Sequence, residues 1–301
     1  MSARSFGASR RKVLRVLAAA ALGASAAAAL AQTSRPDRSG RAARQPRLVT
    51  VGGAITEIVY LLGVEEQLVG TDSTSLYPDP ALRTPKVGYQ RALSAEGLLS
   101  LRPDAIIATT EAGPPVVLDQ VRSAGVKVEL IASDHSWAEV QRKVAAVGRA
   151  AGREAAAREL QARLDGEWAE VQRLVEASPV RRPKVLFVLS HSGSPQVSGS
   201  GTAADAVIRF AGGINCMTGF QGYRPMTAEA MASAAPDLIL TSSQSIDAHG
   251  GAAKFWDRPE LALTPAFRKR SLVTQDALLL LGFGPRLPGA IRELHARMRE
   301  A

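Results

Sequence analysis

The chain has 301 residues and a formal net charge of +9, with 46% hydrophobic and 22% charged residues. Its single cysteine, Cys216, excludes an internal disulfide framework. The positive charge does not predict nucleic-acid binding, because the chain has no zinc-finger spacing, no helical basic stripe and no interleaving of basic and aromatic residues.

The first 31 residues have the pattern of an export signal. Basic residues between Arg10 and Arg15 precede an Ala- and Leu-rich stretch, and a small-x-small cleavage site ends at Ala31. The Arg10–Arg11 pair resembles a twin-arginine signal, but a general secretory signal also carries basic residues here, so both routes stay open. We expect cleavage after Ala31 and a periplasmic location. No later stretch approaches about 18 uninterrupted apolar residues, so we expect no membrane span.

The rest of the chain divides by composition and pattern. Residues 32–46 contain Ser, Pro, Gly and several arginines, and we expect a solvated, disordered tether. The signal holds five basic residues and no acidic ones, so the mature chain is near +4. We expect an N-terminal α/β lobe over residues 47–135, a linking helical region over 136–182 and a C-terminal α/β lobe over 183–301.

A strand, helix, strand alternation predicts the fold of the first lobe. Residues 54–63 space their apolar side chains as a helix does and end at a glycine. Four short apolar runs are typical of strands, at residues 47–51, 67–71, 104–108 and 126–131. Such alternation predicts a parallel, doubly wound sheet.

The longest helical pattern lies between the lobes. From residue 154 to 177 apolar side chains recur three or four positions apart, with Arg and Glu on the other faces. About 24 residues at a rise of 1.5 Å give a helix of roughly 36 Å, the width of a lobe. The helix is either a stiff spine between two lobes or a helix packed on one sheet, and the sequence does not decide.

The second lobe begins with an apolar strand at residues 184–189 and carries an internal repeat. Residues 93–107 match residues 226–240 without a gap, each segment leading from a capped helix through a Pro-Asp turn into an apolar strand. Glu96 and Glu229 occupy equivalent positions in the repeat. The repeat predicts two similar lobes with a cleft between them.

Tyr77 ends a polar run that directly follows the predicted strand 67–71. Pro78 favours an extended backbone at Tyr77 and prevents a helix from absorbing it. Loops at the ends of parallel strands are where open α/β sheets place their ligands. Tyr77 is therefore a candidate iron ligand, and an ordinary half-buried loop tyrosine is the alternative.

Together these features resemble the substrate-binding proteins of bacterial iron-siderophore, cobalamin and haem importers, over nearly all of the mature chain. Residues 73–78, 87–97 and 201–205 are similar to the periplasmic haem-binding proteins of that group. The resemblance implies two doubly wound α/β lobes joined by a long rigid helix, with a b-type haem held in the cleft as the transported ligand. It also implies delivery to an ABC permease dimer with its ATPase subunits, and we expect a monomer that is not an enzyme.

The resemblance places the haem-iron ligand on Tyr77. Ferric iron is a hard Lewis acid and a phenolate oxygen is a hard anionic ligand, so the two match. Arg91 and Arg224 are candidates for stabilising the phenolate or pairing with haem propionates, since arginine stays charged and binds carboxylates through two hydrogen bonds. Tyr223 adjoins Arg224 and is a further possible haem contact. The alternative is that both arginines are solvated surface residues.

His191 follows the predicted strand 184–189 and is a possible axial nitrogen ligand or a contact to a second haem. A hydrogen-bonded loop histidine is the alternative, and His135, His249 and His295 are weaker candidates. No two histidines have the close spacing of a zinc site.

Glu96 and Glu229 are predicted docking residues. In the resembled family, one acidic residue on the outer face of each lobe pairs with arginines of the two permease subunits. Completion of a helix cap is the alternative, and the two roles are compatible.

Two other functions compete with haem binding. The same fold holds ferric siderophores or corrinoids with arginines and aromatic residues. A periplasmic hydrolase is a remote alternative, because the sequence has no Gly-x-Ser-x-Gly elbow, no phosphate-binding Gly-x-x-x-x-Gly-Lys loop and no paired metal-ligand histidines.

Overall fold

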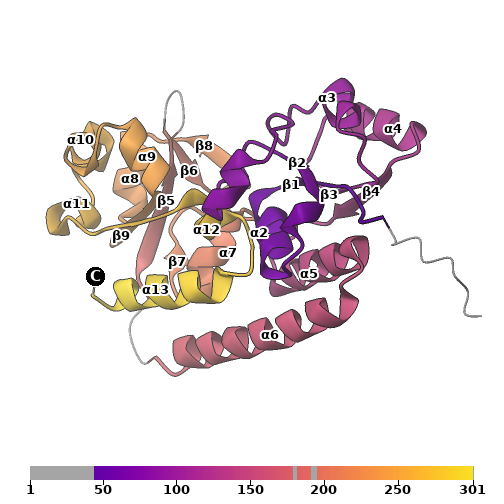
Figure 1. Ribbon diagram of the computed structural model, residues 1–301. Helices are drawn as coiled ribbons and strands as arrows, with labels where there is room; N and C mark the ends of the chain where they lie inside the picture. Colours follow the sequence, from indigo (N-terminus) through magenta and orange to yellow (C-terminus); the bar gives the residue numbers. More distant parts are fainter. Residues whose placement is uncertain (1–43, 179–181, 191–194, 301) are drawn as a thin grey trace, which may run out of the picture. The chain divides into compact units, whose positions relative to one another are not determined.

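The computed structural model describes residues 44–178, 182–190 and 195–300, and all of its helices and strands lie in the unit that starts at Gln45. The predicted export signal, most of the predicted tether and His191 lie outside the described residues. Two α/β lobes follow each other along the chain (Figure 1). Within the described stretches, no helix is both long and apolar enough to cross a membrane.

The first lobe is built on a four-stranded sheet in the order β2-β1-β3-β4, and every pairing is parallel. Its strands are β1 (Leu48–Val51), β2 (Leu68–Thr71), β3 (Ala105–Thr109) and β4 (Lys127–Ile131). The predicted parallel sheet is therefore confirmed. Because the chain moves outward from β1 first to β2 and then to β3, the order reverses beside β1, and such switch points hold ligands.

Helices cover both faces of this sheet. One face packs against α2 (Gly53–Leu61) and α5 (Trp137–Ala151), and the other against α3 (Ala95–Ser100) and α4 (Pro115–Ser123). The inner strands β1 and β3 are mainly apolar on both sides because both sides are buried, as expected for a parallel sheet, whereas the edge strand β4 carries Lys127 and Glu129. Two short 3₁₀ helices, at Glu65–Gln67 and Asp79–Arg83, flank β2 and the loop after it.

The second sheet is mixed rather than wholly parallel. Its order is β10-β9-β5-β6-β8, with β7 paired to the start of β5. The strands β5 (Lys184–Leu189), β7 (Ile214–Asn215), β9 (Leu238–Ser242) and β10 (Leu272–Gln275) pair in parallel, whereas β6 (Gln196–Ser198) pairs antiparallel with both of its neighbours, β5 and β8 (Tyr223–Pro225). The two strands β5 and β6 are too close in the sequence for a crossover helix, which needs about a dozen residues, and they pair antiparallel.

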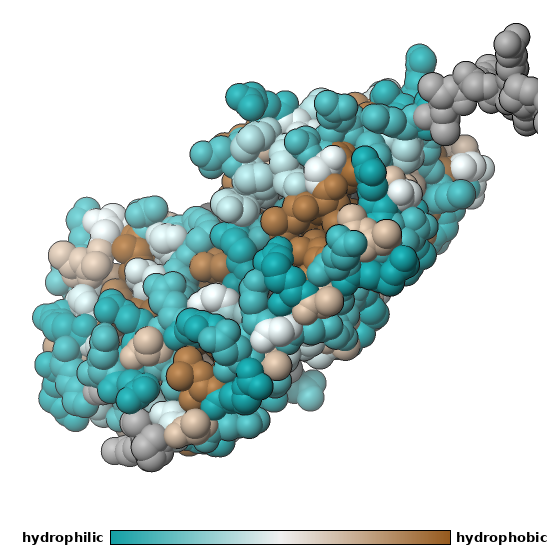
Figure 2. Space-filling view, turned by 60° about the horizontal axis from the view of Figure 1, so that its bottom comes forward, coloured by the Kyte–Doolittle hydropathy of each residue, from teal (hydrophilic) through white to brown (hydrophobic). Residues whose placement is uncertain are grey.

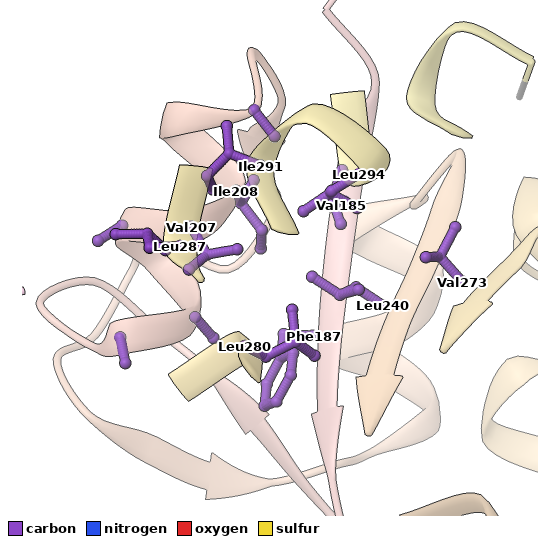
Figure 3. Close-up of a cluster of buried hydrophobic side chains, with 14 of the residues drawn as sticks. Val185, Phe187, Val207, Ile208, Leu240, Val273, Leu280, Leu287, Ile291 and Leu294 are labelled. Carbon is purple, nitrogen blue, oxygen red and sulfur yellow. The ribbon is translucent and has the colours of Figure 1, made fainter. Parts of the chain in front are cut away.

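Helices also cover both faces of the second sheet. Figure 3 shows one face, where Phe187 and Leu240 of the sheet meet Val207 of α7 (Ala203–Phe210) and Leu287 of α13 (Leu287–Glu300), beside α12 (Ala277–Leu281). The opposite face carries α8 (Ala228–Ala234), α9 (Ser243–Ala248), α10 (Ala252–Trp256), α11 (Pro265–Lys269) and a 3₁₀ turn at Pro259–Leu261. The free thiol of Cys216 packs here, and burial raises its pKa to about 12.

The long helix α6 (Glu154–Glu176) contributes to the cores of both lobes. Leu160 and Leu164 pack in the first-lobe core, while Trp168 and Val171 pack in the second-lobe core. Trp168 also stacks on Trp137 of α5, with ring centroids 4.9 Å apart. The outer face of α6 is polar, and the side of the molecule on which it lies is mainly hydrophilic (Figures 1 and 2). The helix therefore spans both lobes, which supports the spine interpretation over packing on one sheet.

The internal repeat is visible in the helix caps. The Ser94 hydroxyl accepts a hydrogen bond from the backbone N–H of Gly97 at 2.9 Å, and the Thr227 hydroxyl accepts one from Ala230 at 3.2 Å. A side-chain oxygen at this position satisfies one of the free N–H groups of the first turn and stabilises the helix by roughly 1 kcal/mol. In both lobes the hydroxyl group of the Ser or Thr therefore caps the helix.

The Pro-Asp turns of the repeat also have matching contacts. The carboxylate of Asp104 accepts a hydrogen bond from the backbone N–H of Arg47 at 2.8 Å, just before β1. The carboxylate of Asp237 accepts one from Lys184 at 2.9 Å, at the start of β5. Each aspartate thus holds the chain at the start of a central strand in its own lobe.

Candidate functional site

A cavity of about 890 Å³ is lined by residues of both lobes. Its walls come from the segments at the carboxyl ends of the parallel strands, including Gly52 after β1, Ser73 after β2 and Ser133 after β4. The second lobe contributes Leu189 of β5 and Gln244 after β9. The volume is at the upper end of the range of about 300–1,000 Å³ that small-molecule sites occupy. Both sheets therefore present their ligand-binding edge to one shared cavity.

The loop that carries Tyr77 is held by a buried carboxylate. Asp72 is fully buried, and its oxygens accept hydrogen bonds from the backbone N–H groups of Gly52 at 2.9 Å and Thr74 at 3.0 Å, and from the Ser75 hydroxyl at 2.8 Å. These bonds tie the loop after β2 to the turn after β1. The polar residues that follow β2 in the sequence therefore have a structural role, since their hydrogen bonds hold this loop in place.

Lys86 closes the same loop from the other side. Its ammonium group donates to the Thr71 hydroxyl at 2.8 Å and to the carbonyls of Ser75 and Ala81, each at 3.0 Å. Burial lowers the pKa of Lys86, and the charge of Asp72 opposes that change. The loop between β2 and the 3₁₀ helix at Asp79–Arg83 is thus anchored at several points.

Close packing beside this loop depends on Gly53. A Cβ atom there would lie 2.7 Å from the carbonyl oxygen of Thr74 and 2.8 Å from the side chain of Leu278 in the second lobe. Any larger residue would push the loop or the second lobe away, because real Cβ atoms do not approach other atoms so closely. The glycine brings the loop and both lobes together at the cavity.

Tyr77 lies at the edge of the cavity rather than in its wall. Its neighbour Leu76 is a lining residue, whereas the Tyr77 side chain is 42% exposed. The guanidinium carbon of Arg286 lies 3.8 Å from the centroid of the Tyr77 ring. This distance is well inside the range of about 6 Å for a cation–π contact.

Arg286 is held in turn by Glu57 of α2. Its Nε–H donates to both carboxylate oxygens, at 3.0 and 2.9 Å, across the junction of the two lobes. Burial raises the pKa of Glu57, and the charge and hydrogen bond of Arg286 work against that rise. The pair fixes the direction of the guanidinium group.

Arg91 lines the cavity, as expected from its predicted role. Its guanidinium group donates to the carboxylate of Glu111 at 2.9 Å, and Tyr89 and Glu111 also line this wall. The pair is partly exposed, so its attraction is screened by water and a ligand carboxylate can compete for the arginine.

Tyr223 and Arg224 separate at the cavity. Tyr223 is a lining residue, and burial raises the pKa of its phenol to about 12. Arg224 lies outside the lining and packs over the ring of Phe220, 4.7 Å from its centroid. Successive side chains of a strand point to opposite faces of the sheet, which explains why these two adjacent residues of β8 point to different sides.

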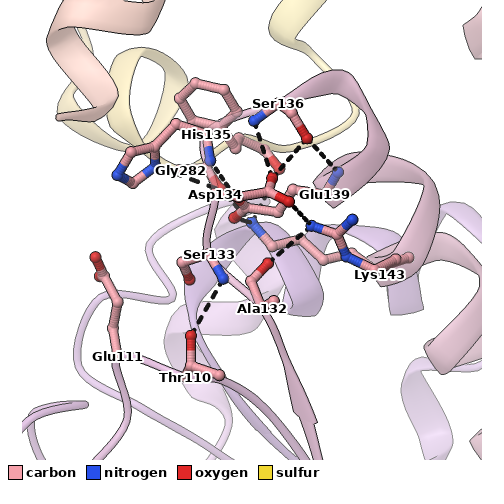
Figure 4. A network of polar contacts seen from close by, with 12 residues as sticks. Thr110, Glu111, Ala132, Ser133, Asp134, His135, Ser136, Glu139, Lys143 and Gly282 are labelled. Atoms are coloured by element: carbon pink, nitrogen blue, oxygen red, sulfur yellow. Dashed lines mark hydrogen bonds and ion pairs between the residues drawn. The ribbon is translucent and has the colours of Figure 1, made fainter. Parts of the chain in front are cut away.

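A buried ion pair closes the cavity on the side of α5. Lys143 and Glu139 are 2% and 3% exposed at their side chains and lie 2.6 Å apart, and both line the cavity. The Lys143 ammonium group also donates to the carbonyls of Gly282 and Phe283 in the second lobe, at 2.9 and 3.1 Å (Figure 4). Burial lowers the pKa of Lys143, and Glu139 opposes that change.

His135 is a lining residue that the sequence ranked behind His191. Its backbone N–H donates to the second oxygen of Glu139 at 2.8 Å, and its ring lies 5.3 Å from that of Phe283 (Figure 4). The sequence did indicate this position, since His135 follows the carboxyl end of a parallel strand, as Tyr77 does. Arg286, by contrast, has no sequence signal that links it to Tyr77.

The two predicted docking glutamates lie away from the cavity. Glu96 and Glu229 are exposed in the first turns of α3 and α8, and neither lines the cavity. The caps of these helices come from Ser94 and Thr227, so the glutamates are not needed for capping. Both carboxylates face solvent at equivalent places in the repeat.

The cavity lining mixes apolar residues with polar and charged ones. Ile55, Leu189, Leu278 and Leu281 supply apolar surface, while charged side chains of both signs, Arg91, Lys143, Glu111 and Glu139, also line the cavity. Among the described residues, no three His, Cys, Asp or Glu side chains gather to hold a free metal ion. This arrangement suits a large ligand that has both apolar surface and polar or charged groups, rather than a bare ion.

Comparison with known proteins gives a consistent assignment. The family model described as "Periplasmic binding protein" matches residues 48–278. The solved structure of the periplasmic haem-binding protein BhuT, in complex with two haems, is 47% identical with a TM-score of 0.81, and the match covers 85% of this chain and 98% of that one.

Curated relatives include an uncharacterised ABC transporter substrate-binding lipoprotein, YvrC, of Bacillus subtilis. It is 24% identical over 255 residues, which are 82% of this chain and 78% of the relative. A vitamin B12-binding protein of Vibrio cholerae is 33% identical over 82 residues only, 27% of this chain and 30% of the relative. Because the family model matches most of this chain, the chain belongs to the periplasmic binding protein family.

Proposed function

We propose that the chain is a periplasmic substrate-binding protein that holds haem in the interlobe cavity and delivers it to an ABC permease. The observation that carries this proposal is the 47% identity to a haem-binding protein over 98% of that protein's length. The cavity agrees with it, because haem is a large apolar plate with two carboxylates. Arg91, which lines the cavity, is the proposed partner of a propionate, and Tyr77, next to the lining residue Leu76, is the proposed iron ligand.

The competing ligands have weaker support. The vitamin B12-binding relative matches over 82 residues, less than a third of this chain, whereas the haem-binding match spans both lobes. A ferric siderophore or a corrinoid therefore remains a comparison ligand for the experiment. Family and neighbours are transport proteins, so an enzymatic activity has no support.

The proposal is tested by titrating the purified chain with haemin, with cobalamin and with a ferric siderophore under the same conditions. We expect a saturable change in the haem absorption spectrum, with the charge-transfer band of a tyrosinate–iron complex. Haem should bind with a dissociation constant at least about a hundredfold lower than that of cobalamin, a difference of roughly 2.7 kcal/mol. Saturable binding of cobalamin or siderophore with no spectral change from haem would overturn the proposal.

The docking role of Glu96 and Glu229 gives a separate prediction. Replacing both with alanine is expected to leave haem affinity unchanged and to lower haem uptake about tenfold or more. The reason is that paired charges across an interface set partner encounter and register. Uptake is measured in cells that depend on haem as their iron source and carry the matching permease.

A matched control separates docking from general loss of surface charge. Glu65 and Glu154 are also exposed acidic residues in first turns, in the 3₁₀ helix before β2 and in α6. Their double alanine variant should take up haem normally. Equal uptake by the two double variants would count against the docking role.

The remaining expectations follow from the family. We propose a periplasmic location after cleavage of the export signal at Ala31, and a monomer as the working form. Mass spectrometry of the exported protein would show Gln32 as its first residue if cleavage occurs where proposed.

A further inference from the structure

A smaller cavity lies in the second lobe, apart from the interlobe cavity. Its volume is about 250 Å³, and it shares no lining residue with the interlobe cavity. Its walls come from the ends of α6 and α7, the last turns of α13 and the chain just before β5. The helices α6 and α13 pack against each other (Figure 1). The volume is below the range of about 300–1,000 Å³ that most small-molecule sites occupy, so the cavity suits a small ligand.

Three arginines from different elements line this smaller cavity. Arg182 precedes β5, Arg209 is in the last turn of α7, and Arg299 is in the last turn of α13. Arg209 lies 3.3 Å from the carboxylate of Asp205 on its own helix, and its side chain is 61% exposed. Glu176 is the acidic residue of the lining. The lining therefore carries an excess of positive charge.

Two of these arginines have no salt-bridge partner within residues 44–178, 182–190 and 195–300. Neither Arg182 nor Arg299 pairs with a carboxylate there, although the neighbouring Arg297 pairs with Glu300. A basic residue in the last turn stabilises its own helix through the helix dipole, which accounts for Arg209 and Arg299. Arg182 belongs to no helix, so helix ends do not explain why the three arginines meet at one cavity.

Two buried polar atoms of the lining also lack a partner among the described residues. His295 is 6% exposed, and its Nδ1–H donates to the carbonyl of Ala211 at 2.9 Å, but its Nε2 has no hydrogen bond. The hydroxyl oxygen of Ser178 is likewise buried and unpaired. Leaving a buried polar atom unpaired is costly, and native proteins contain few such atoms. A polar ligand in the cavity would supply the missing partners.

The turn after α7 is shaped to hold the His295 ring. Gly212 has a φ of +87°, in the left-handed region that favours glycine. A Cβ atom there would lie 3.1 Å from the side chain of Val175 and 3.6 Å from Nδ1 of His295. Glycine thus lets the end of α7 approach both α6 and α13, and the cavity is enclosed by close packing rather than by loose surface side chains.

We propose that this cavity binds a phosphate group through the guanidinium groups of Arg182, Arg209 and Arg299. The Ser178 hydroxyl and the His295 ring provide further hydrogen-bonding groups. Guanidinium groups bind phosphate oxygens through two parallel hydrogen bonds, and the excess of positive charge favours an anion. Inorganic phosphate and the headgroup of an anionic phospholipid share this chemistry. The site is independent of the proposed haem site, because the two cavities have no lining residue in common.

The test titrates the purified, haem-free chain with inorganic phosphate at constant ionic strength, followed by calorimetry and by the melting temperature. We expect saturable binding and a rise in melting temperature of about 5 °C at a hundredfold excess over the dissociation constant. Arg182→Gln with Arg299→Gln should lower the affinity at least about tenfold, because two charge-assisted contacts are lost. Both side chains are exposed and unpaired, so this double variant should fold normally.

A matched control removes the same charge elsewhere on the surface. Arg153 and Arg158 are exposed near the start of α6 and line neither cavity. Their double glutamine variant should bind phosphate with the affinity of the unsubstituted chain. Ser178→Ala removes one unpaired hydroxyl and should lower the affinity about threefold.

Vesicles distinguish the two sources of the phosphate group. If the group belongs to a lipid, the unsubstituted chain should bind vesicles that contain phosphatidylglycerol but not vesicles of phosphatidylcholine alone, and the Arg182 and Arg299 double variant should not bind either. Binding of inorganic phosphate without vesicle binding supports a free phosphate ligand. Absence of saturable binding to both probes overturns the proposal, and so does an equal loss of binding in the two double variants. The haemin titration has no bearing on these outcomes, so this site and the proposed function can fail separately.

Discussion

Replacing Tyr77 with phenylalanine is expected to weaken haem binding at least about a hundredfold and to abolish the tyrosinate–iron band. Phenylalanine keeps the ring that packs against Arg286 but removes the oxygen that would bind iron. Loss of groups that only support a metal ligand already costs about 10–100-fold in affinity, so loss of the ligand itself should cost more. Haemin titration followed by absorption measures both effects in one experiment.

The control for this substitution is another tyrosine of the same chain. Tyr60 lies in α2, is partly buried and does not line the cavity. Tyr60→Phe should bind haem with unchanged affinity and an unchanged spectrum. If Tyr77→Phe retained the band, the iron ligand would be sought among the other cavity residues, with His135 first because it lines the wall.

Tyr77→Phe also discriminates between ligand classes. A ferric siderophore brings its own iron ligands, so a siderophore-binding protein would lose little affinity from a missing phenol oxygen. A haem-binding protein loses an axial ligand that the porphyrin does not supply. A small effect on binding together with a saturable siderophore titration would therefore move the assignment to siderophores.

The elements that the sequence predicted well are those set by local pattern. The strands at residues 184–189 and 67–71 and the helix from residue 154 onward lie where apolar spacing predicted them. Ser94 and Thr227 cap their helices because a hydroxyl at that position satisfies a free N–H group locally. Such features depend on neighbours a few residues away, and a single sequence contains that information.

The features that the sequence missed depend on distant contacts. Arg286 and Tyr77 are separated by most of the chain, so no local pattern could pair them. The antiparallel strands β6 and β8 have three residues each, too few to show a period of two. His135 could have been ranked higher, because the rule that singled out Tyr77 applies equally to a residue after β4.

The proposed haem site was only partly predictable. Arg91 and Tyr223 line the cavity, whereas Arg224 points to Phe220 and Tyr77 stands at the edge. Resemblance places a residue in a segment but not on a side of that segment. The side is decided by packing, as at Gly53, where Leu278 of the other lobe approaches closely.

Replacing Lys143 with alanine is expected to lower the free energy of unfolding by about 3–5 kcal/mol, because it leaves a buried carboxylate without a partner. Glu139, with 3% side-chain exposure, would lose its partner, and the carbonyls of Gly282 and Phe283 would lose their donor. For a chain of this size that corresponds to a fall in melting temperature of roughly 10 °C. Denaturant unfolding and calorimetry of the ligand-free chain measure both quantities.

The informative control removes both charges of the pair at once. Replacing Lys143 with methionine and Glu139 with glutamine leaves no lone buried charge, and glutamine still offers an oxygen to the backbone N–H of His135. Its stability should lie within about 1 kcal/mol of the unsubstituted chain, since neutral replacement of buried pairs is often nearly neutral. Equal losses in the two variants would show that the hydrogen bonds to the second lobe, rather than the charge balance, carry the stability. In that case Lys143 would act chiefly by joining the lobes, and haem affinity should fall in both variants as the cavity wall loosens.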